Sequence, residues 1–335
     1  MERVLEVKDL HVTFTTYGGT IQAVRGVSFS LNKGETFAIV GESGCGKSVT
    51  SQSIMGLLPS YSAKITKGSI LFKGTDLTQV SEKEIRTIRG AEISMIFQDP
   101  MTALNPTLTV GEQLMEAVLQ HKKITRKEAK KAVLSMLDLV GIPNPDERFK
   151  QYPHEFSGGM RQRIVIAMAL MCEPEVIIAD EPTTALDVTI QAQILELFNK
   201  IQKETGVAII LITHDLGIVA QVADRIAVMY AGKMVETGTR REIFYHPQHP
   251  YTKGLLHSVP RLDLKGAELI PVPGTPPDLF SPPSGCPFTA RCPYAMEVCE
   301  KVYPVETYLS DHHHVYCWLQ DKRAKAVQLS SINGQ

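Results

Sequence analysis

The stretch TFAIVGESGCGKS, residues 36–48, joins an apolar run to a glycine-rich loop, and it decides the fold. Gly41, Gly46, Lys47 and Ser48 have the spacing of a phosphate-binding loop, which lies between a buried strand and a helix. The glycines let successive backbone amides turn toward a phosphate, and the helix N-terminus adds positive potential. An ordinary glycine turn is the alternative, which the apolar run before the loop and the helical pattern after it disfavour.

The side chains of this loop predict a site for a nucleoside triphosphate with magnesium. We expect Lys47 to reach the outer phosphates and the Ser48 hydroxyl to bind Mg²⁺. The loop residues expected to bind the nucleotide are Gly41, Ser43, Gly44, Cys45, Gly46, Lys47, Ser48 and Val49. Because Cys45 lies in the positive potential of the loop, we expect a lowered thiol pKa and an alkylation that bound nucleotide blocks.

The remaining patterns predict an α/β fold with a parallel core sheet. The continuous apolar runs TFAIV (36–40), VIIAD (176–180) and VAIILIT (207–213) are typical of parallel strands buried on both faces, and helical patterns lie between them. The first 30 residues form short patterned strands instead, which indicates an antiparallel sheet packed on that core. From about residue 245 a proline-rich segment leads into a small tail.

Polar residues follow the predicted strands. Asp180 and Glu181 end VIIADE, His214 follows the next apolar run in LITHD, and Gln98 ends MIFQ. Taken alone, an acidic pair is usually solvated, a histidine is usually structural and a glutamine usually lies on the surface. Because parallel strands end at one edge of a sheet, we expect these side chains to meet there. Asp180 and Gln98 can then bind Mg²⁺, while Glu181, with His214 and Gln98, acts on the attacking water.

A second anion-binding pattern is EFSGGMRQR, residues 155–163. Ser157 can cap a helix whose first turn, with Gly158 and Gly159, presents free backbone amides and a positive dipole to an anion. By themselves these residues are more often a plain capped helix. Since the first loop already holds a phosphate, the pattern raises the question of whose phosphate the second one contacts.

The phosphate loop, Gln98, FSGGM, the DE pair, TALD and His214, in this order, resemble the nucleotide-binding domain of ABC transporters. The resemblance covers about residues 3–245. It implies a P-loop NTPase fold with a helical subdomain at about 99–170, and an enzyme that hydrolyses ATP with Mg²⁺.

By the same resemblance, two such domains pack head to tail, and the signature of one contacts the γ-phosphate held by the loop of the other. The signature residues are Ser157, Gly158, Gly159 and Met160. Met160 replaces the glutamine common at this position, which removes one amide side chain. Asp187 is implied to communicate across the dimer. An aromatic near the first strand is implied to stack on adenine; Phe14 is the first choice and Tyr17 the second, although such an aromatic can equally belong to the core.

The segment HPQHPYTKGLLHSVP and the cysteine-containing tail resemble the C-terminal extension of ATPases from dipeptide and oligopeptide importers, over about residues 230–320. The implied function is ATP-driven peptide import at the cytoplasmic face of a prokaryotic cell membrane. The implied partners are two transmembrane permease subunits, a second ABC ATPase (a heterodimer is favoured over a homodimer) and, indirectly, an extracytoplasmic peptide-binding protein. Segment 99–115 is implied to contact the permease. We therefore expect a nucleotide-binding domain at 1–245 and an extension at 246–335.

The tail holds four cysteines: Cys286, Cys292, Cys299 and Cys317. The 5, 6 and 17 residues between them are loose for zinc, whose sites usually begin with two to four intervening residues. Two Cys-Pro pairs and four thiolates suit a 4Fe–4S cluster, which members of the resembled subfamily carry here. Zn²⁺ and four unliganded thiols are the alternatives. We expect the histidines at 312–314 to form a solvated turn and Cys172 to lie in the core.

Composition and charge exclude some functions. With 35 basic and 36 acidic residues and a pI near 6.8, the chain has no general attraction for nucleic acid. Its charged start and the lack of a long apolar stretch predict a cytosolic chain that docks on a membrane. A soluble ABC ATPase, as in phosphonate breakdown, and an importer ATPase for another cargo such as nickel remain alternatives. A non-catalytic regulator is disfavoured by Glu181 and His214.

Overall fold

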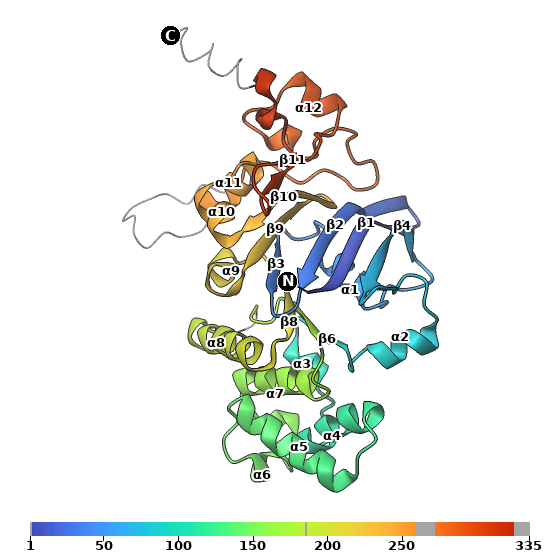
Figure 1. Cartoon of the computed structure of the whole chain (residues 1–335), viewed down its shortest axis with the longest axis vertical. Helices are drawn as coiled ribbons and strands as arrows, with labels where there is room; N and C mark the ends of the chain where they lie inside the picture. Colours follow the sequence, from blue (N-terminus) through green and yellow to red (C-terminus); the bar gives the residue numbers. More distant parts are fainter. Residues whose placement is uncertain (1, 185, 259–271, 325–335) are drawn as a thin grey trace.

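The computed structural model describes residues 2–184, 186–258 and 272–324. Within these residues the larger sheet has eight strands, and the five from β9 to β6 run parallel (Figure 1). The other three strands pair antiparallel at one edge. The order across the sheet is β11 (Thr307–Tyr308), β12 (His314–Val315), β10 (Lys233–Thr239), β9 (Arg225–Tyr230), β3 (Thr36–Val40), β8 (Ala208–Thr213), β7 (Val176–Asp180) and β6 (Ile93–Ile96).

The second sheet is antiparallel, as the patterned first 30 residues predict. Its order is β2 (Gly19–Asn32), β1 (Arg3–Thr16), β4 (Ala63–Phe72) and β5 (Thr75–Asp76). The α/β fold class with a parallel core sheet and an N-terminal antiparallel sheet is therefore confirmed.

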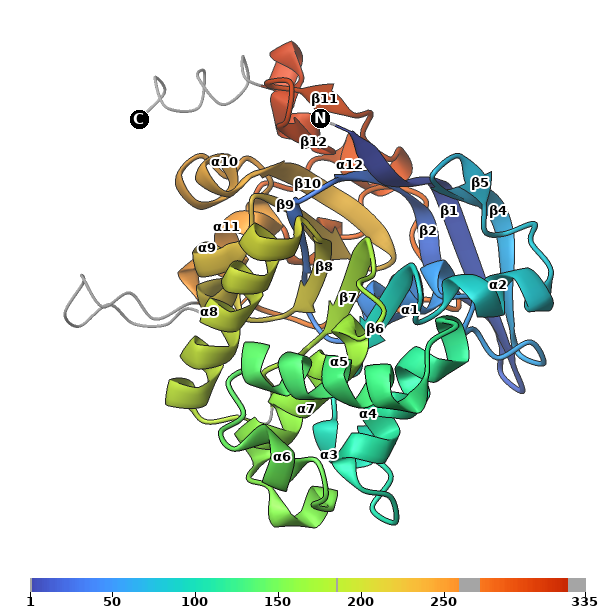
Figure 2. The same cartoon turned by 60° about the horizontal axis from the view of Figure 1, so that its bottom comes forward.

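Helices flank the large sheet and also gather in a separate group. The helices are α1 (Lys47–Ile54), α2 (Glu82–Ile88), α3 (Pro100–Ala103), α4 (Val110–His121), α5 (Arg126–Leu139), α6 (Pro145–Arg148), α7 (Gly158–Leu170), α8 (Val188–Thr205), α9 (Leu216–Val222), α10 (Arg240–Tyr245), α11 (Pro250–His257) and α12 (Glu297–Lys301), with short 3₁₀ turns η1 (Pro153–Glu155), η2 (Thr289–Arg291) and η3 (Trp318–Gln320). The group α3 to α7 is the predicted helical subdomain, at the bottom of Figure 1 and turned forward in Figure 2. No helix in the described ranges combines the length and the apolar character needed to cross a bilayer.

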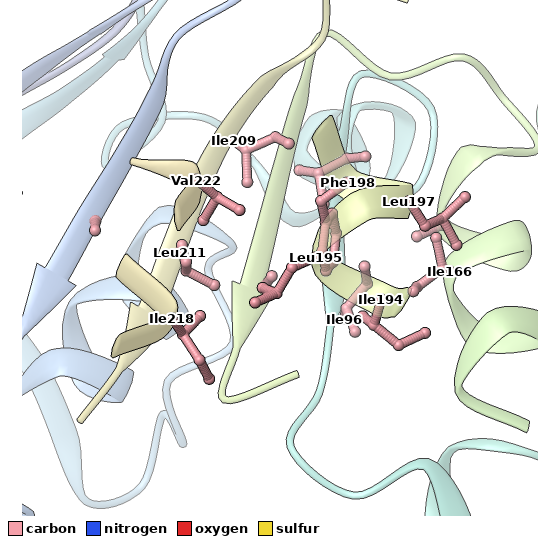
Figure 3. Close-up of a cluster of buried hydrophobic side chains, with 14 of the residues drawn as sticks. Ile96, Ile166, Ile194, Leu195, Leu197, Phe198, Ile209, Leu211, Ile218 and Val222 are labelled. Atoms are coloured by element: carbon pink, nitrogen blue, oxygen red, sulfur yellow. The ribbon is translucent and has the colours of Figure 1, made fainter. Parts of the chain in front are cut away.

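Both faces of the parallel strands are buried, which explains their continuous apolar runs. In β3, Phe37 and Ile39 join the cluster beneath the antiparallel sheet, whereas Ala38 and Val40 join the cluster covered by α7 and α8. Figure 3 shows part of the second cluster, in which Phe198 of α8 lies among the side chains of neighbouring elements. Each fully buried large apolar side chain stabilises the fold by about 1.5–3 kcal/mol, so these two layers hold the strand ends in place.

The tail continues the large sheet. β12 pairs with β10 and β11 pairs with β12, so the sheet crosses the predicted boundary near residue 245. The proline-rich segment also contacts the antiparallel sheet, because the backbone amide of Gln22 donates to the carbonyl of Leu279 at 2.9 Å. The division into 1–245 and 246–335 stays a prediction.

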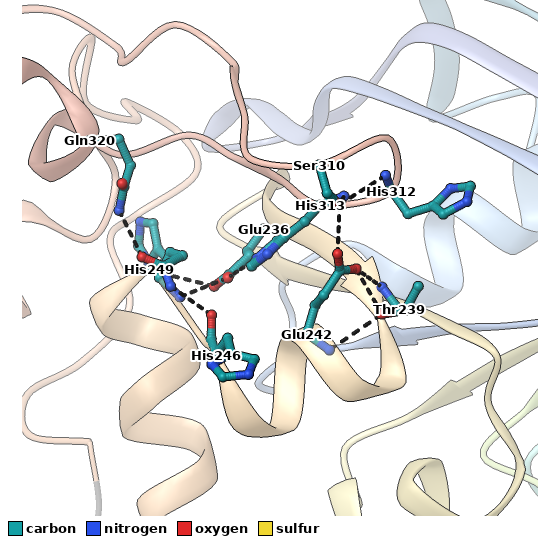
Figure 4. Close-up of polar contacts among 10 residues, drawn as sticks. Glu236, Thr239, Glu242, His246, His249, Ser310, His312, His313 and Gln320 are labelled. Atoms are coloured by element: carbon teal, nitrogen blue, oxygen red, sulfur yellow. Dashed lines mark hydrogen bonds and ion pairs between the residues drawn. The ribbon is translucent and has the colours of Figure 1, made fainter.

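The histidine run at 312–314 is only partly the solvated turn that we predicted, because His312 is exposed but His313 is not. The His313 side chain is buried, and its Nε2 lies 2.8 Å from Oε1 of Glu236, which is fully buried (Figure 4). The Glu236 carboxylate also accepts hydrogen bonds from the backbone amides of Gln248 and His249, at 2.8 and 2.9 Å. The prediction was wrong for His313 because the pairing of β12 with β10 brings this residue, which precedes β12, over a buried carboxylate.

Candidate functional site

The loop between β3 and α1 needs glycine at two positions. A Cβ on Gly41 would lie 2.1 Å from the carbonyl oxygen of Met229, and one on Gly46 would lie 2.4 Å from that of Ala23. Both glycines also have positive φ, +155° and +103°. A Cβ on Gly44 would meet nothing within 4 Å, so this part of the loop faces open space. The loop is therefore packed tightly on one side and open to a ligand on the other.

Lys47 and Ser48 bring an ammonium group and a hydroxyl to the start of α1. The Lys47 side chain is buried, and its Nζ donates to the carbonyls of Gly41 at 2.8 Å and Glu42 at 3.0 Å. The Ser48 hydroxyl donates to Oδ1 of Asp180, at the end of β7, at 3.2 Å. Burial raises the pKa of Asp180 above its ordinary value, although the bond from Ser48 opposes this shift. A hydroxyl beside a carboxylate offers the oxygen ligands that Mg²⁺ prefers.

Glu181 connects three side chains from different parts of the chain. Its carboxylate lies 3.0 Å from Nδ1 of His214, accepts from the Thr184 hydroxyl at 3.0 Å and accepts from Nε2 of Gln98 at 2.9 Å. Burial favours a higher pKa for Glu181, but the contacts with His214 and Thr184 outweigh it, so the pKa lies below its ordinary value. Glu181 also has a φ of +49°, a left-handed conformation that is uncommon for glutamate. The structure thus brings Gln98, Glu181 and His214 together, as the strand-end argument predicts.

Apart from Asp180, these groups line one cavity of about 700 Å³, which is a typical size for a small-molecule site. The predicted residues that line it are Gly41, Ser43, Gly44, Gly46, Lys47, Ser48, Val49, Gln98, Glu181 and His214. Sequence reasoning missed the other lining residues, which are Ile21, Ala23, Glu42, Thr184, Leu255 and Leu279. Thr184 lies three residues after Glu181, close enough to have been found. Leu255 lies in the segment HPQHPYTKGLLHSVP, which was singled out only for its family resemblance, and Leu279 carries no recognisable pattern.

Ser157 caps α7, as predicted, and its hydroxyl accepts from the amide of Met160 at 3.4 Å. Ser157 and Gly158 are exposed. None of residues 157–160, all of which the structure describes, lines the cavity that contains Lys47. Asp187 caps α8 in the same way and is exposed. Of the predicted cross-chain residues, Ser157, Gly158 and Asp187 therefore face solvent in one chain, whereas Gly159 is buried and Met160 packs partly buried against the core.

The two aromatic candidates for adenine stacking have different surroundings. Phe14 is partly buried against the core beneath the antiparallel sheet, while Tyr17 is fully exposed at the turn between β1 and β2. Neither lines the cavity as it stands, although Ile21, which pairs with Phe14 across β1 and β2, does.

The expected lowering of the Cys45 pKa was wrong, while the alkylation that nucleotide would block stays a prediction. Cys45 is buried and does not line the cavity, and burial raises the pKa of its thiol although Lys47 lies nearby. Desolvation of the thiolate outweighs the positive potential of the loop, because the side chain points to the packed side of the loop, where a Cβ on Gly41 would meet its sulfur at 2.9 Å. Cys172, by contrast, is buried as predicted.

The four tail cysteines surround one small cavity beside Trp318. Burial raises the pKa of Cys286 to about 11 and that of Cys317 to about 12. In the described residues, however, no three His, Cys, Asp or Glu side chains are arranged to hold a metal ion. The arrangement therefore does not support the expected 4Fe–4S cluster or the zinc alternative, although donors of a suitable kind converge.

The sequence matches two protein families. Residues 24–184 match the ABC transporter family, and residues 235–299 match the family described as oligopeptide/dipeptide transporter, C-terminal region. The chain is 76% identical to the dipeptide transport ATP-binding protein DppD of Bacillus subtilis, over 98% of each chain. It is 59% identical to the oligopeptide transport ATP-binding protein OppD of the same organism, over 97% of this chain and 91% of the relative.

Solved structures agree with this result. One is the dimeric structure of MJ0796, a bacterial ABC transporter cassette, which is 27% identical with a TM-score of 0.63 and covers 71% of this chain and 99% of the other. Another is cbiO1 from Clostridium perfringens, part of the ABC transporter complex cbiONQ, which is 32% identical with a TM-score of 0.64 and covers 73% and 92%.

Proposed function

Because the chain belongs to the dipeptide and oligopeptide transport ATP-binding proteins of the ABC transporter family, we propose that its ATPase activity powers the import of dipeptides or oligopeptides. The observation that carries this proposal is the 76% identity with the dipeptide transport protein over 98% of both chains. The match to the C-terminal region of this transporter family favours peptide cargo over a soluble ATPase or a nickel importer.

The residues of the cavity have distinct roles in the proposed hydrolysis. Lys47 and the loop amides hold the β- and γ-phosphates of ATP. Ser48 and Asp180, with Gln98, are the candidate ligands of Mg²⁺, which would neutralise charge that develops on the phosphates. Glu181 is ionised at neutral pH, because its pKa lies below the ordinary value, so it can orient the attacking water and accept its proton. His214 and Gln98 fix the orientation of that carboxylate.

The signature helix acts, in this proposal, on the nucleotide of a second ATPase subunit. Two observations support this role. The cap of α7 is exposed, and the described residues that line the cavity of Lys47 include none from the start of α7. Ser157, Gly158 and Gly159 then offer amides and a helix dipole to the γ-phosphate of the partner, and Asp187 lies at the same interface. We favour a heterodimer over a homodimer.

Two transmembrane permease subunits and an extracytoplasmic peptide-binding protein complete the proposed importer, with the chain on the cytoplasmic face of the cell membrane. Segment 99–115 of the helical region is the proposed permease contact. We assign the nucleotide-binding domain to 1–245 and the extension to 246–335. For adenine we now favour Tyr17 over Phe14, because its ring is exposed while that of Phe14 is used in packing.

Uptake by a reconstituted transporter tests this function. The chain is purified with its permease subunits and partner ATPase, placed in liposomes and supplied with the binding protein, ATP and a labelled dipeptide. We expect ATP-dependent uptake that competes with unlabelled peptide and is lost in Glu181→Gln. An ATPase that co-purifies with no membrane protein would favour the soluble alternative, and uptake of Ni²⁺ but not peptide would favour the nickel importer.

Iron–sulfur binding at the four tail cysteines is a separate and finer proposal. It is supported by the convergence of four thiols on one cavity and opposed by their arrangement. Anaerobically purified protein should show visible absorption with matching iron and sulfide contents. Colourless protein without iron would reject the cluster and leave the ATPase proposal unchanged.

A further inference from the structure

The tail reaches the phosphate loop through an ion pair between Arg291 and Glu42. Nη1 and Nη2 of Arg291 donate to the two carboxylate oxygens of Glu42 at 2.7 and 2.9 Å. The Arg291 side chain is only 4% exposed and that of Glu42 is 25% exposed. A two-pronged contact of this kind fixes orientation as well as charge, and it is stronger away from water.

Glu42 belongs to the nucleotide site. It follows Gly41 in the loop and lines the same cavity as Lys47. Its carbonyl accepts a hydrogen bond from the Lys47 Nζ at 3.0 Å, and its amide donates to the hydroxyl of Tyr251 in α11 at 2.9 Å. The carboxylate, carbonyl and amide of Glu42 are therefore all held, and two of their partners, Arg291 and Tyr251, come from residues after 245.

Arg291 is rigidly placed by other contacts. Its Nε donates to the carbonyl of Pro273 at 2.7 Å, Nη2 donates to that of Val272 at 2.9 Å, and Nη1 donates to the Tyr230 hydroxyl at 3.1 Å. It ends η2, directly before Cys292. The bonds from Glu42 and Tyr230 hold the pKa of Arg291 above its ordinary value although burial opposes them.

We propose that Arg291 is a positioning residue for ATP, which acts through Glu42. This inference rests on the proposed function, because it concerns the same ATP site. A carboxylate in the loop would repel the triphosphate unless its charge were neutralised and its side chain held aside. Arg291 does both, so the tail sets the affinity of the phosphate loop for ATP in its own chain. The tail reaches the cavity independently at Leu279, which agrees with this role.

The test compares Arg291→Met with wild type in the full chain, assembled with its partner ATPase and permease. Loss of the cation leaves the Glu42 carboxylate unpaired beside the phosphates, so we expect the KM for ATP and the Kd of a fluorescent ATP analogue to rise at least about tenfold, with a much smaller change in kcat. Arg291→Lys keeps the charge but loses the two-pronged contact, so its Kd for ATP should lie between those of wild type and Arg291→Met. The matched control is Arg323→Met, an exposed arginine of the same tail, which should behave as wild type.

A second substitution separates positioning from a merely structural role. In Arg291→Met/Glu42→Gln the unpaired carboxylate is gone, so the Kd for ATP should return toward that of Glu42→Gln alone. If Arg291 served only to hold the segment at 272–273, Glu42→Gln would restore nothing. Lack of restoration, or an unchanged Kd in Arg291→Met, overturns the inference. If Arg291→Met does not fold, an unchanged Kd in Arg291→Lys overturns it instead.

Different results would contradict the proposed function and the role of Arg291. A wild-type complex that binds the ATP analogue but neither hydrolyses ATP nor transports peptide contradicts the proposed function. The ratio of the Kd values still decides the role of Arg291 in that case. If the wild-type complex transports peptide but the Kd for ATP does not change when Arg291 is substituted, only the inference about Arg291 is contradicted.

Discussion

The phosphate-loop edge and the tail both contain buried or half-buried polar groups whose partners lie far apart in the sequence, but only at the loop edge does each partner belong to a recognisable motif. At the loop edge, each charged group lies within a short motif at the end of a strand, as Lys47 and Glu181 do. In the tail, His313 pairs with Glu236, 77 residues away, and Arg291 pairs with Glu42, 249 residues away. The comparison shows that the first kind of site can be predicted from spacing, whereas the second needs the fold.

The largest expected effect tests the loop edge. Glu181→Gln keeps the size of the side chain but cannot accept a proton, so kcat for ATP hydrolysis should fall by about 10²–10⁴-fold. ATP binding and ATP-driven dimerisation should persist. Steady-state ATPase assays and gel filtration with ATP measure both. The control is Glu204→Gln, an exposed residue of α8, and an unchanged kcat in Glu181→Gln would remove the catalytic role of this edge.

The next effect tests the tail. Glu236→Ala leaves His313 and two backbone amides without their buried acceptor, so the free energy of unfolding should fall by about 4 kcal/mol. Denaturant unfolding of the tail, followed by the fluorescence of Trp318, measures it. Glu297→Ala, at an exposed ion pair with Lys301, should cost less than about 1 kcal/mol. Equal losses of stability in Glu236→Ala and Glu297→Ala would mean that the contact between His313 and Glu236 contributes no more to docking the tail than an exposed ion pair does.

A pH series sharpens the same comparison. Burial lowers the pKa of His249 to about 4, below its ordinary value of 6.5. As pH falls below about 6.5, the unfolded chain takes up this proton before the folded chain does, so up to about 3 kcal/mol of stability is lost toward pH 4. Unfolding curves at several pH values should show a smaller loss in His249→Gln. The exposed His257→Gln is the control, and an unaltered pH dependence in His249→Gln contradicts the assignment.

The smallest effect concerns the cap of α7. Ser157→Ala removes the acceptor for the amide of Met160, so the free energy of unfolding should fall by about 1 kcal/mol. Thermal unfolding of the isolated chain measures this loss. Ser60→Ala, at an exposed loop position, should leave stability unchanged. If the ATPase activity of the assembled transporter falls by more than this small loss of stability can explain, the result would add support for a contact with the partner's nucleotide.

Much of the candidate site could be predicted because its rules are local. The glycine spacing predicted the loop that Gly41 and Gly46 make possible, and the strand-end argument predicted the meeting of Gln98, Glu181 and His214. The same reasoning failed for Cys45, since the sequence placed its thiol in a positive loop but could not tell on which side of the loop the thiol would lie.

The sequence by itself determined the α/β class, the phosphate loop, the capped signature helix and the family, because apolar periodicity, glycine spacing and capping depend on neighbours along the chain. Only the tertiary structure decided that Arg291 holds Glu42, that His313 is buried on Glu236 and that the tail lines the cavity of Lys47. Charge interactions depend on distance in space and on exclusion of water, and neither quantity is recorded in the spacing of residues along a chain.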